Sequence, residues 1–412
     1  MNNIFLDRNL IEKINGKALE LKDYTVKNLS KIIQVKAMSN DEKNRIMLLK
    51  NLCKKAGADE VKIDGLGNCL ARVGTGNKKL VIDAHIDTVD VGDINSWEKD
   101  PFSGDFDDKY VYGRGASDQL AGAASMITAI KILKDIGYKG LNDYCVWFSF
   151  TIIEEDCDGL CWKYLIEEEK FIPDFFISTE PTSLNIYRGH RGRMEMEVKL
   201  RGVSCHGSAP ERGVSAAYLA SRAALAIEKL NSELKPDKEN FLGKGTATVS
   251  IMEVKGPSQC AVPDIARLYI DRRLTEGETK ELAVEQVKTY ISNATGLEKD
   301  KIEVTIPEYK KPSWKKTLFT QELYFPTWVF AESHPLIQIA KNTYINLFGK
   351  EPLIDKWTFS TNGVAVAGHH KIPSMGFGPG DEKEAHAPNE KVRIEDLVKA
   401  SSFYAAFPYG IS

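Results

Sequence analysis

The sequence is poor in cysteine, has no excess of positive charge and lacks a long apolar run. Seven cysteines among 412 residues are few and odd in number, so we expect reduced thiols rather than a disulfide framework. Lys and Arg number 55 against 58 Asp and Glu, whereas a nucleic-acid-binding protein usually carries a basic excess. No apolar run reaches the roughly 18 residues that a membrane-spanning helix needs. We therefore expect no binding to nucleic acid or to membranes.

The N-terminal residues lack the apolar stretch of a signal peptide, which together with the reduced thiols predicts a cytoplasmic location. What is present is the composition of an ordinary globular protein, with 42% hydrophobic and 27% charged residues. At roughly 100–200 residues per domain, the length is enough for two or three domains. A globular protein of this size is most often an enzyme.

Apolar runs alternate with helical segments in the first part of the chain. Residues 80–85, 144–152 and 174–179 are near-continuous apolar runs, typical of strands buried on both faces. Residues 20–56 are expected to be mainly helical, and residues 120–136 form a helix of small and apolar side chains. This alternation predicts an α/β domain in which helices cover both faces of the sheet.

The pattern changes in the middle of the chain. Residues 194–202 alternate between apolar and polar side chains, which indicates a sheet with one solvated face. Two helices and three further strands follow, and together they give the order β-α-β-β-α-β of a ferredoxin-like unit. We expect this unit to occupy residues 190–310 as an inserted α+β domain, with 1–189 and 311–412 forming one larger domain around it.

Histidines and carboxylates follow the predicted strands, at the end of the sheet where open α/β folds place their ligands. Each has an ordinary explanation when taken alone, such as a loop position, a helix N-cap for Asp118 or a surface histidine for His386. As a set they match the needs of two metals, because these require one shared carboxylate, then one histidine and one carboxylate each. The candidate ligands are His85, Asp118, one of the neighbours Glu154 and Glu155, Glu180 and His386. Nitrogen and oxygen ligands without thiolate suit Zn, Mn or Co.

Two pairs of neighbouring residues indicate a division of labour. Asp87 lies two residues after His85, on the same side of an extended strand, where it can bind the second ring N–H of a metal-bound histidine. Glu154 and Glu155 follow an apolar strand, so one can bind a metal while the other acts as general base toward water. Solvated loop charges are the alternative explanation for this pair.

Seven segments occur in a fixed order along the chain: DAHIDTVD (83–90), GRGASDQLAG (113–122), IIEEDCDG (152–159), STEPT (178–182), GVSCHGSAPERG (202–213), DRRL (271–274) and GPGDEKEAHAPNE (378–390). From about residue 10 to the C-terminus, the chain resembles the dinuclear-zinc aminoacylase/carboxypeptidase family. This family includes acetylornithine deacetylase, succinyl-diaminopimelate desuccinylase and glutamate carboxypeptidase. YRGHRGR (187–193) and DRRLTEGET (271–279) are also similar to a subgroup of selenium-metabolism-linked hydrolases.

The resemblance implies a phosphorylase/hydrolase-like catalytic domain with a mixed sheet, and it makes the ferredoxin-like insertion a lid and dimerisation domain of a homodimer. It also implies two divalent metal ions, with zinc expected first and cobalt or manganese as alternatives. The implied roles are His85 and Glu180 on the first metal, Glu155 and His386 on the second, Asp118 as the bridge, Asp87 orienting His85, and Glu154 as general base.

His206 and Arg273 extend the resemblance into the inserted domain. His206 is similar to the family's oxyanion-stabilising histidine, and Arg273 to the arginine that pairs with a substrate carboxylate. Both are also explained as ordinary polar residues, at a helix entrance and on an exposed strand. Cys260 replaces an asparagine and Leu120 a lysine that are common in the family, so a familiar substrate is not assumed.

The expected activity is metal-dependent hydrolysis of an amide bond in a small N-acyl or N-carbamoyl amino acid that carries a carboxylate. A dipeptidase or carboxypeptidase of the same family is the first alternative, and hydrolysis of a ureido compound is another. A non-catalytic metal-binding homologue is a further alternative, but the ligand set and the base are complete.

Overall fold

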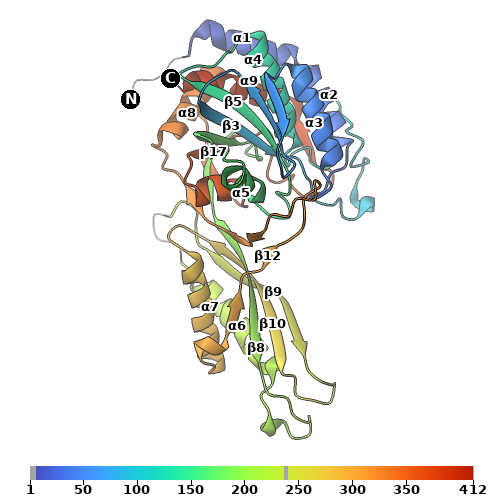
Figure 1. Cartoon of the computed structure of the whole chain (residues 1–412), viewed down its shortest axis with the longest axis vertical. Coiled ribbons are helices and arrows are strands. Elements are labelled where there is room, and N and C mark those ends of the chain that lie inside the picture. Colours follow the sequence, from blue (N-terminus) through green and yellow to red (C-terminus); the bar gives the residue numbers. More distant parts are fainter. Residues whose placement is uncertain (1–5, 236–239, 412) are drawn as a thin grey trace. The chain divides into compact units, whose positions relative to one another are not determined.

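The computed structural model describes residues 6–235 and 240–411, which divide into two compact units (Figure 1). The first unit comprises Met1–Gly189, Lys310–Phe319 and Val329–Ser412, and the second comprises His190–Tyr309 and Thr320–Trp328. The second unit therefore interrupts the first along the chain. None of the helices within the described residues is both long and apolar enough to span a membrane.

The first unit is built on a mixed sheet. Across the sheet the strands are β1 (Glu60–Ile63), β2 (Cys69–Val73), β5 (Tyr144–Thr151), β3 (Lys78–His85), β6 (Phe175–Ser178), β17 (Ser374–Gly376), β7 (Ile186–His190) and β15 (Trp328–Val329), and β16 (Ile354–Trp357) also pairs with β7. β3 runs parallel to β5 and β6, whereas β1, β2 and β7 run antiparallel to their neighbours. Every residue of β5 is buried, as its apolar run predicts for a strand covered on both faces.

The helices of the first unit pack around this sheet (Figure 1). They are α1 (Arg8–Glu20), α2 (Lys22–Ile33), α3 (Lys43–Ala56), α4 (Leu120–Asp135), α5 (Leu160–Glu167), α8 (Pro335–Phe348) and α9 (Ile394–Gly410), with a π-helix at Val364–His369 and a 3₁₀ turn at Ile94–Ser96. Helix α4 packs against α2 and α9. Its small residues allow a close approach to the sheet, since a Cβ added at Gly122 would clash with the Thr179 hydroxyl just after β6.

A small second sheet of the first unit joins distant parts of the chain. β4 (Tyr110–Tyr112) pairs antiparallel with β18 (Lys391–Arg393). This pairing brings the residues that precede β18 next to the loop that follows β4. Both segments carry predicted site residues, so the small sheet brings two parts of the site together.

The second unit has a five-stranded sheet with two helices on one face. Its main elements are β8 (Gly192–Arg201), α6 (Ala216–Glu233), β9 (Thr246–Lys255), β10 (Ile265–Leu274), α7 (Lys280–Thr295) and β11 (Glu303–Thr305), with 3₁₀ turns at Pro210–Arg212 and Lys299–Lys301. The strand order β11-β8-β10-β9 is fully antiparallel, which is the ferredoxin-like arrangement. Buried and partly exposed residues alternate along β8, so one face of the sheet packs against the helices, as the sequence pattern predicts.

Four short strands follow β11. They are β12 (Glu308–Tyr309), β13 (Gln321–Glu322), β14 (Tyr324–Phe325) and β15 (Trp328–Val329). β14 pairs with β8, opposite Met194 and Arg193, and this pairing is why Thr320–Trp328 belongs to the second unit. The sequence pattern predicts the larger domain for all of residues 311–412, whereas Thr320–Trp328 belongs to the second unit.

Candidate metal centre

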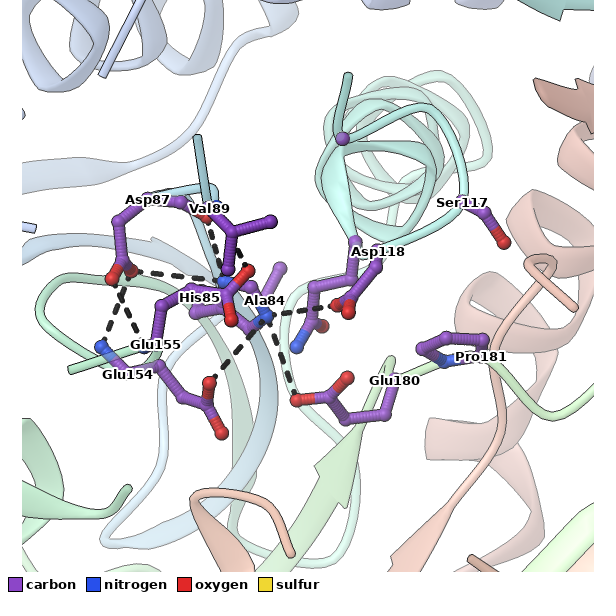
Figure 2. A network of polar contacts seen from close by, with 12 residues as sticks. Ala84, His85, Asp87, Val89, Ser117, Asp118, Glu154, Glu155, Glu180 and Pro181 are labelled. Carbon is purple, nitrogen blue, oxygen red and sulfur yellow. Dashed lines mark hydrogen bonds and ion pairs between the residues drawn. The ribbon is translucent and has the colours of Figure 1, made fainter. Parts of the chain in front are cut away.

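The predicted ligands converge at one end of the sheet in the first unit (Figure 2). His85 is the last residue of β3, Glu154 and Glu155 follow β5, and Glu180 follows β6. Because these three strands are parallel neighbours, their carboxyl ends lie at the same edge and direct the side chains to one place.

Asp118 lies between the two histidines of the site. Its Oδ1 atom is 3.0 Å from Nε2 of His85, and its Oδ2 atom is 3.4 Å from Nε2 of His386. The N-cap of α4 is Gln119, so capping of this helix does not account for Asp118. A carboxylate whose two oxygens face two imidazoles has the arrangement of a bridging ligand between two metals.

Further carboxylates surround each histidine. Glu155 Oε2 lies 3.0 Å from Nε2 of His386. Glu180 Oε1 and Glu154 Oε2 lie 3.7 Å and 3.8 Å from Nε2 of His85. Two overlapping groups have ligand atoms within 4.8 Å of one another: His85, Asp118 and Glu155, and His85, Glu154 and Glu180. Figure 2 shows the carboxylates of Asp118, Glu154 and Glu180 directed at the His85 ring.

The site concentrates negative charge away from water. Burial raises the pKa of Glu154 well above its usual range, and the carboxylates of Glu180 and Glu155 add to this rise. Burial also raises the pKa of Glu180, with Asp118 and Glu155 as further causes. Burial by itself would lower the pKa of His85, but the surrounding carboxylates raise it well above its usual range. Such a cluster of buried acids is stabilised when cations lie among them.

The residues present fit two divalent cations. The Oε2 atom of Glu180 is buried and has no hydrogen-bond partner, which is costly unless another group binds it. The converging donors are imidazole nitrogens and carboxylate oxygens, a set suited to zinc, manganese or cobalt. Oδ1 of Asp118 faces His85, which Glu180 also approaches, and Oδ2 of Asp118 faces His386, which Glu155 contacts.

Asp87 is buried and contacts the candidate ligands in two ways. Nδ1 of His85 lies 3.0 Å from the main-chain carbonyl oxygen of Asp87 and 3.6 Å from its carboxylate Oδ1. The carboxylate accepts hydrogen bonds from the main-chain N–H groups of Glu154, at 3.2 Å, and Glu155, at 3.1 Å. Ser39 donates a third hydrogen bond to it at 2.6 Å. Asp87 therefore contacts both His85 and the peptide that carries the two glutamates.

Sequence reasoning missed several residues that support the site. Ser39 lies between α2 and α3, within a segment expected to be mainly helical, and no motif marks it. Asn68 accepts a hydrogen bond from the N–H of Ile152, two residues before Glu154. Glu390 closes the motif that contains His386, so its place in that motif was the available signal.

His206 and Arg273 belong to the second unit. His206 is exposed, its Nδ1 lies 2.7 Å from the Ser208 hydroxyl, and it lines a cavity of about 840 Å³ together with Cys260. Arg273 lies on β10 and forms two hydrogen bonds with the Asp271 carboxylate, at 2.8 Å and 3.0 Å. The predicted metal ligands, by contrast, all belong to the first unit.

The fold and this site define a metal-dependent hydrolase. The sequence pattern of Peptidase family M20/M25/M40 matches residues 81–409. The chain belongs to this family, and it is a metallohydrolase.

Three known proteins show the extent of the similarity. The chain is 46% identical over 380 residues to the Escherichia coli K12 protein YgeY, covering 92% of each. It is 27% identical over 329 residues to acetylornithine deacetylase from Pectobacterium atrosepticum, covering 79% of this chain and 78% of that protein. Its fold matches that of the Bacillus subtilis YxeP protein, a dinuclear-metal-binding peptidase of the M20 family, with a TM-score of 0.69 and 13% identity. That match covers 94% of this chain and 98% of the other.

Proposed function

We propose that this protein hydrolyses the amide bond of a small N-acyl or N-carbamoyl amino acid with two divalent metal ions. The observation that carries the proposal is the position of Asp118, whose two carboxylate oxygens face the imidazoles of His85 and His386. In the proposal His85 and Glu180 hold the first ion and Glu155 and His386 hold the second. Zinc is proposed as the native metal, with cobalt and manganese as the alternatives that the donor set also suits.

The proposed mechanism assigns the proton transfer to Glu154 and the support of this base to Asp87. When bound, the two ions polarise the scissile carbonyl and lower the pKa of the attacking water. Glu154, whose pKa burial raises, accepts the proton of that water and passes it to the nitrogen of the leaving amine. Asp87 holds the main-chain amide of Glu154 and so fixes the base in place.

Two residues of the second unit complete the proposal. His206 stabilises the oxyanion of the tetrahedral intermediate, and its hydrogen bond with Ser208 orients the ring. Arg273 pairs with the carboxylate of the substrate, for which its planar guanidinium is well suited. Nε and Nη2 of Arg273 donate to the Asp271 carboxylate, so a substrate carboxylate at this edge would compete with Asp271 for them.

The choice of an acylated amino acid is supported by the similarity to acetylornithine deacetylase over most of both chains. Cleavage of dipeptides or of a C-terminal residue uses the same attack on an amide carbonyl and is the alternative. A screen of N-acyl amino acids, N-carbamoyl amino acids and dipeptides, with Zn, Co and Mn supplied separately, decides between them. Turnover confined to dipeptides would overturn the acyl or carbamoyl choice and leave the metal chemistry intact.

We also propose that the protein is a cytoplasmic homodimer that associates through the second unit. β9 lies at the edge of its sheet and exposes Ile251, Met252 and Val254. Helix α6 exposes Tyr218 and Leu225, whose side chains are 69% and 65% accessible. An exposed edge strand beside exposed apolar side chains is suited to pairing with a second copy. A single monomer mass by light scattering at micromolar concentration would contradict the dimer.

A further inference from the structure

Glu390 is a buried acid in the first unit that the proposed mechanism does not use. Its side chain is 0% exposed, and its two oxygens accept four hydrogen bonds. Oε1 accepts from the main-chain N–H groups of Ser117, at 2.7 Å, and Asp118, at 2.9 Å. Oε2 accepts from the N–H of Gly115, at 2.8 Å, and from Nη1 of Arg114, at 2.9 Å. One carboxylate therefore binds most of the loop that ends in Asp118.

Arg114 extends these contacts to the segment that carries His386. Its Nη1 atom also lies 3.2 Å from the carbonyl oxygen of Ala387, and its Nη2 atom lies 3.4 Å from that of His386. The guanidinium stacks on the ring of Trp97, with 5.0 Å to the ring centre. Because Glu390 is in turn only four residues after His386, the Arg114–Glu390 pair fastens the two ligand-bearing loops to each other.

The loop that carries Asp118 needs such support. It lies outside any helix or strand, and Gly113 and Gly115 adopt φ angles of +138° and +86°. The amides of this loop therefore do not form the regular hydrogen bonds of a helix or strand. The Glu390 carboxylate binds them instead. A metal site requires its ligands to be held to within about 0.5 Å, so the support of these ligands affects affinity directly.

We infer that Glu390 is a positioning residue that sets Asp118 and His386 at the spacing needed for the second metal, with Arg114 as its partner. The inference rests on the proposed two-metal function. Both oxygens of Glu390 accept from the amides of the Asp118 loop and from Arg114, so the residue acts through these groups rather than as a ligand. Its loss is therefore expected to weaken the site of Glu155 and His386 more than the site of His85 and Glu180.

Glu390→Gln tests the inference most specifically, because glutamine has nearly the same shape as glutamate but only one acceptor oxygen. Whichever way the amide is turned, its NH₂ group faces donors: either the N–H groups of Ser117 and Asp118, or Gly115 N–H and Arg114. Loss of comparable residues behind metal ligands costs about 10–100-fold in metal affinity.

The experiment is a titration of the metal-free full chain with Co²⁺, followed by calorimetry and by the visible absorption of bound cobalt. For the wild type we expect two binding events. For Glu390→Gln we expect one event near the wild-type affinity and a second weakened about 10–100-fold, with the matching part of the cobalt spectrum shifted to higher metal concentration. Thermal unfolding of the metal-free variants reports any general loss of stability separately.

Glu278→Gln is the matched control in the second unit. Its carboxylate likewise accepts from an arginine, Arg272, and from a main-chain amide, that of Thr275. We expect both cobalt events to stay unchanged in this variant. Two wild-type events in Glu390→Gln would overturn the inference, whereas fewer than two events in the wild type would instead overturn the proposed function.

If Glu390→Gln does not yield folded protein, Arg114→Lys decides the question. Lysine keeps the charge but lacks the fork that reaches both Glu390 and the carbonyl groups of His386 and Ala387. A selective weakening of the second cobalt event supports the inference, and an unchanged pair of events overturns it.

Discussion

His85 contacts Asp87 through the main chain of Asp87, with Nδ1 of the ring 3.0 Å from its carbonyl oxygen. The Asp87 carboxylate is 3.6 Å away from the same nitrogen and is bound by the amides of Glu154 and Glu155. The orientation of the histidine and that of the two glutamates therefore depend on different atoms of one residue. Substitution of the carboxylate separates the two effects.

We expect Asp87→Asn to lower turnover and to weaken the metal held by Glu155 and His386, while the metal at His85 stays bound. The main-chain carbonyl still binds His85, but the asparagine NH₂ group opposes one of the glutamate amides, so Glu154 and Glu155 shift. The expected decrease in kcat is about 10–100-fold, as for other residues behind metal ligands. Metal content and kcat are measured on the same preparation. Ser39→Ala, which removes one neighbouring donor to Asp87, should lower kcat less. A loss of metal without a loss of kcat per metal would contradict this account.

Two helical glycines should respond to alanine in opposite directions. A Cβ at Gly122 in α4 would clash with the Thr179 hydroxyl, so Gly122→Ala should destabilise the fold by about 1–3 kcal/mol. A Cβ at Gly16 in α1 meets nothing within 4 Å, so Gly16→Ala should stabilise the protein by about 0.5–1 kcal/mol. Chemical denaturation of the metal-free variants measures both. Equal effects would show that α4 does not lie this close to the sheet.

Removal of metal should lower the melting temperature. Without cations the buried carboxylates of Glu154, Glu155 and Glu180 repel one another or take up protons. A ligand at 100 times its Kd stabilises the folded state by about 2.7 kcal/mol, so saturating zinc should restore a readily measured shift. Calorimetry with chelator, and again after zinc addition, tests this. An identical melting temperature in both states would contradict binding at this site.

His206→Ala should lower kcat while leaving the metal content of the first unit unchanged. The imidazole belongs to the second unit, and its proposed task is to donate to the oxyanion. Loss of one such donor typically lowers kcat by about 10²–10³-fold. Steady-state kinetics and metal analysis of the same sample provide the comparison. A kcat equal to that of the wild type would contradict the proposed role of His206 in stabilising the oxyanion.

The strands, and the convergence of the candidate ligands at one edge of the sheet, could be predicted from the sequence because they depend on local patterns. The apolar run of β5 and the alternation along β8 each reflect how many faces of the strand are buried. His85 is the last residue of β3 and Glu155 lies four residues after the end of β5, at the edge of the sheet where the parallel strands converge.

The supporting residues could not be predicted in the same way, because their partners are distant in sequence. Ser39 binds Asp87 across 48 positions, and Glu390 binds the Asp118 amide across 272. The segment containing Ser39 was also expected to be mainly helical, whereas α2 ends at Ile33 and α3 begins at Lys43. The main-chain contact between Asp87 and His85 could not be predicted from the sequence for another reason. β3 ends at His85, so the extended geometry that would align the two side chains does not continue to Asp87.

The central claim is that two metals and Glu154 carry out the hydrolysis together. The most direct test measures metal content and turnover of Glu154→Gln beside the wild type, on a substrate identified by the screen. The account predicts two divalent ions per chain in both proteins and a kcat about 10²–10⁴-fold lower in the variant. Comparable turnover in Glu154→Gln would contradict the account.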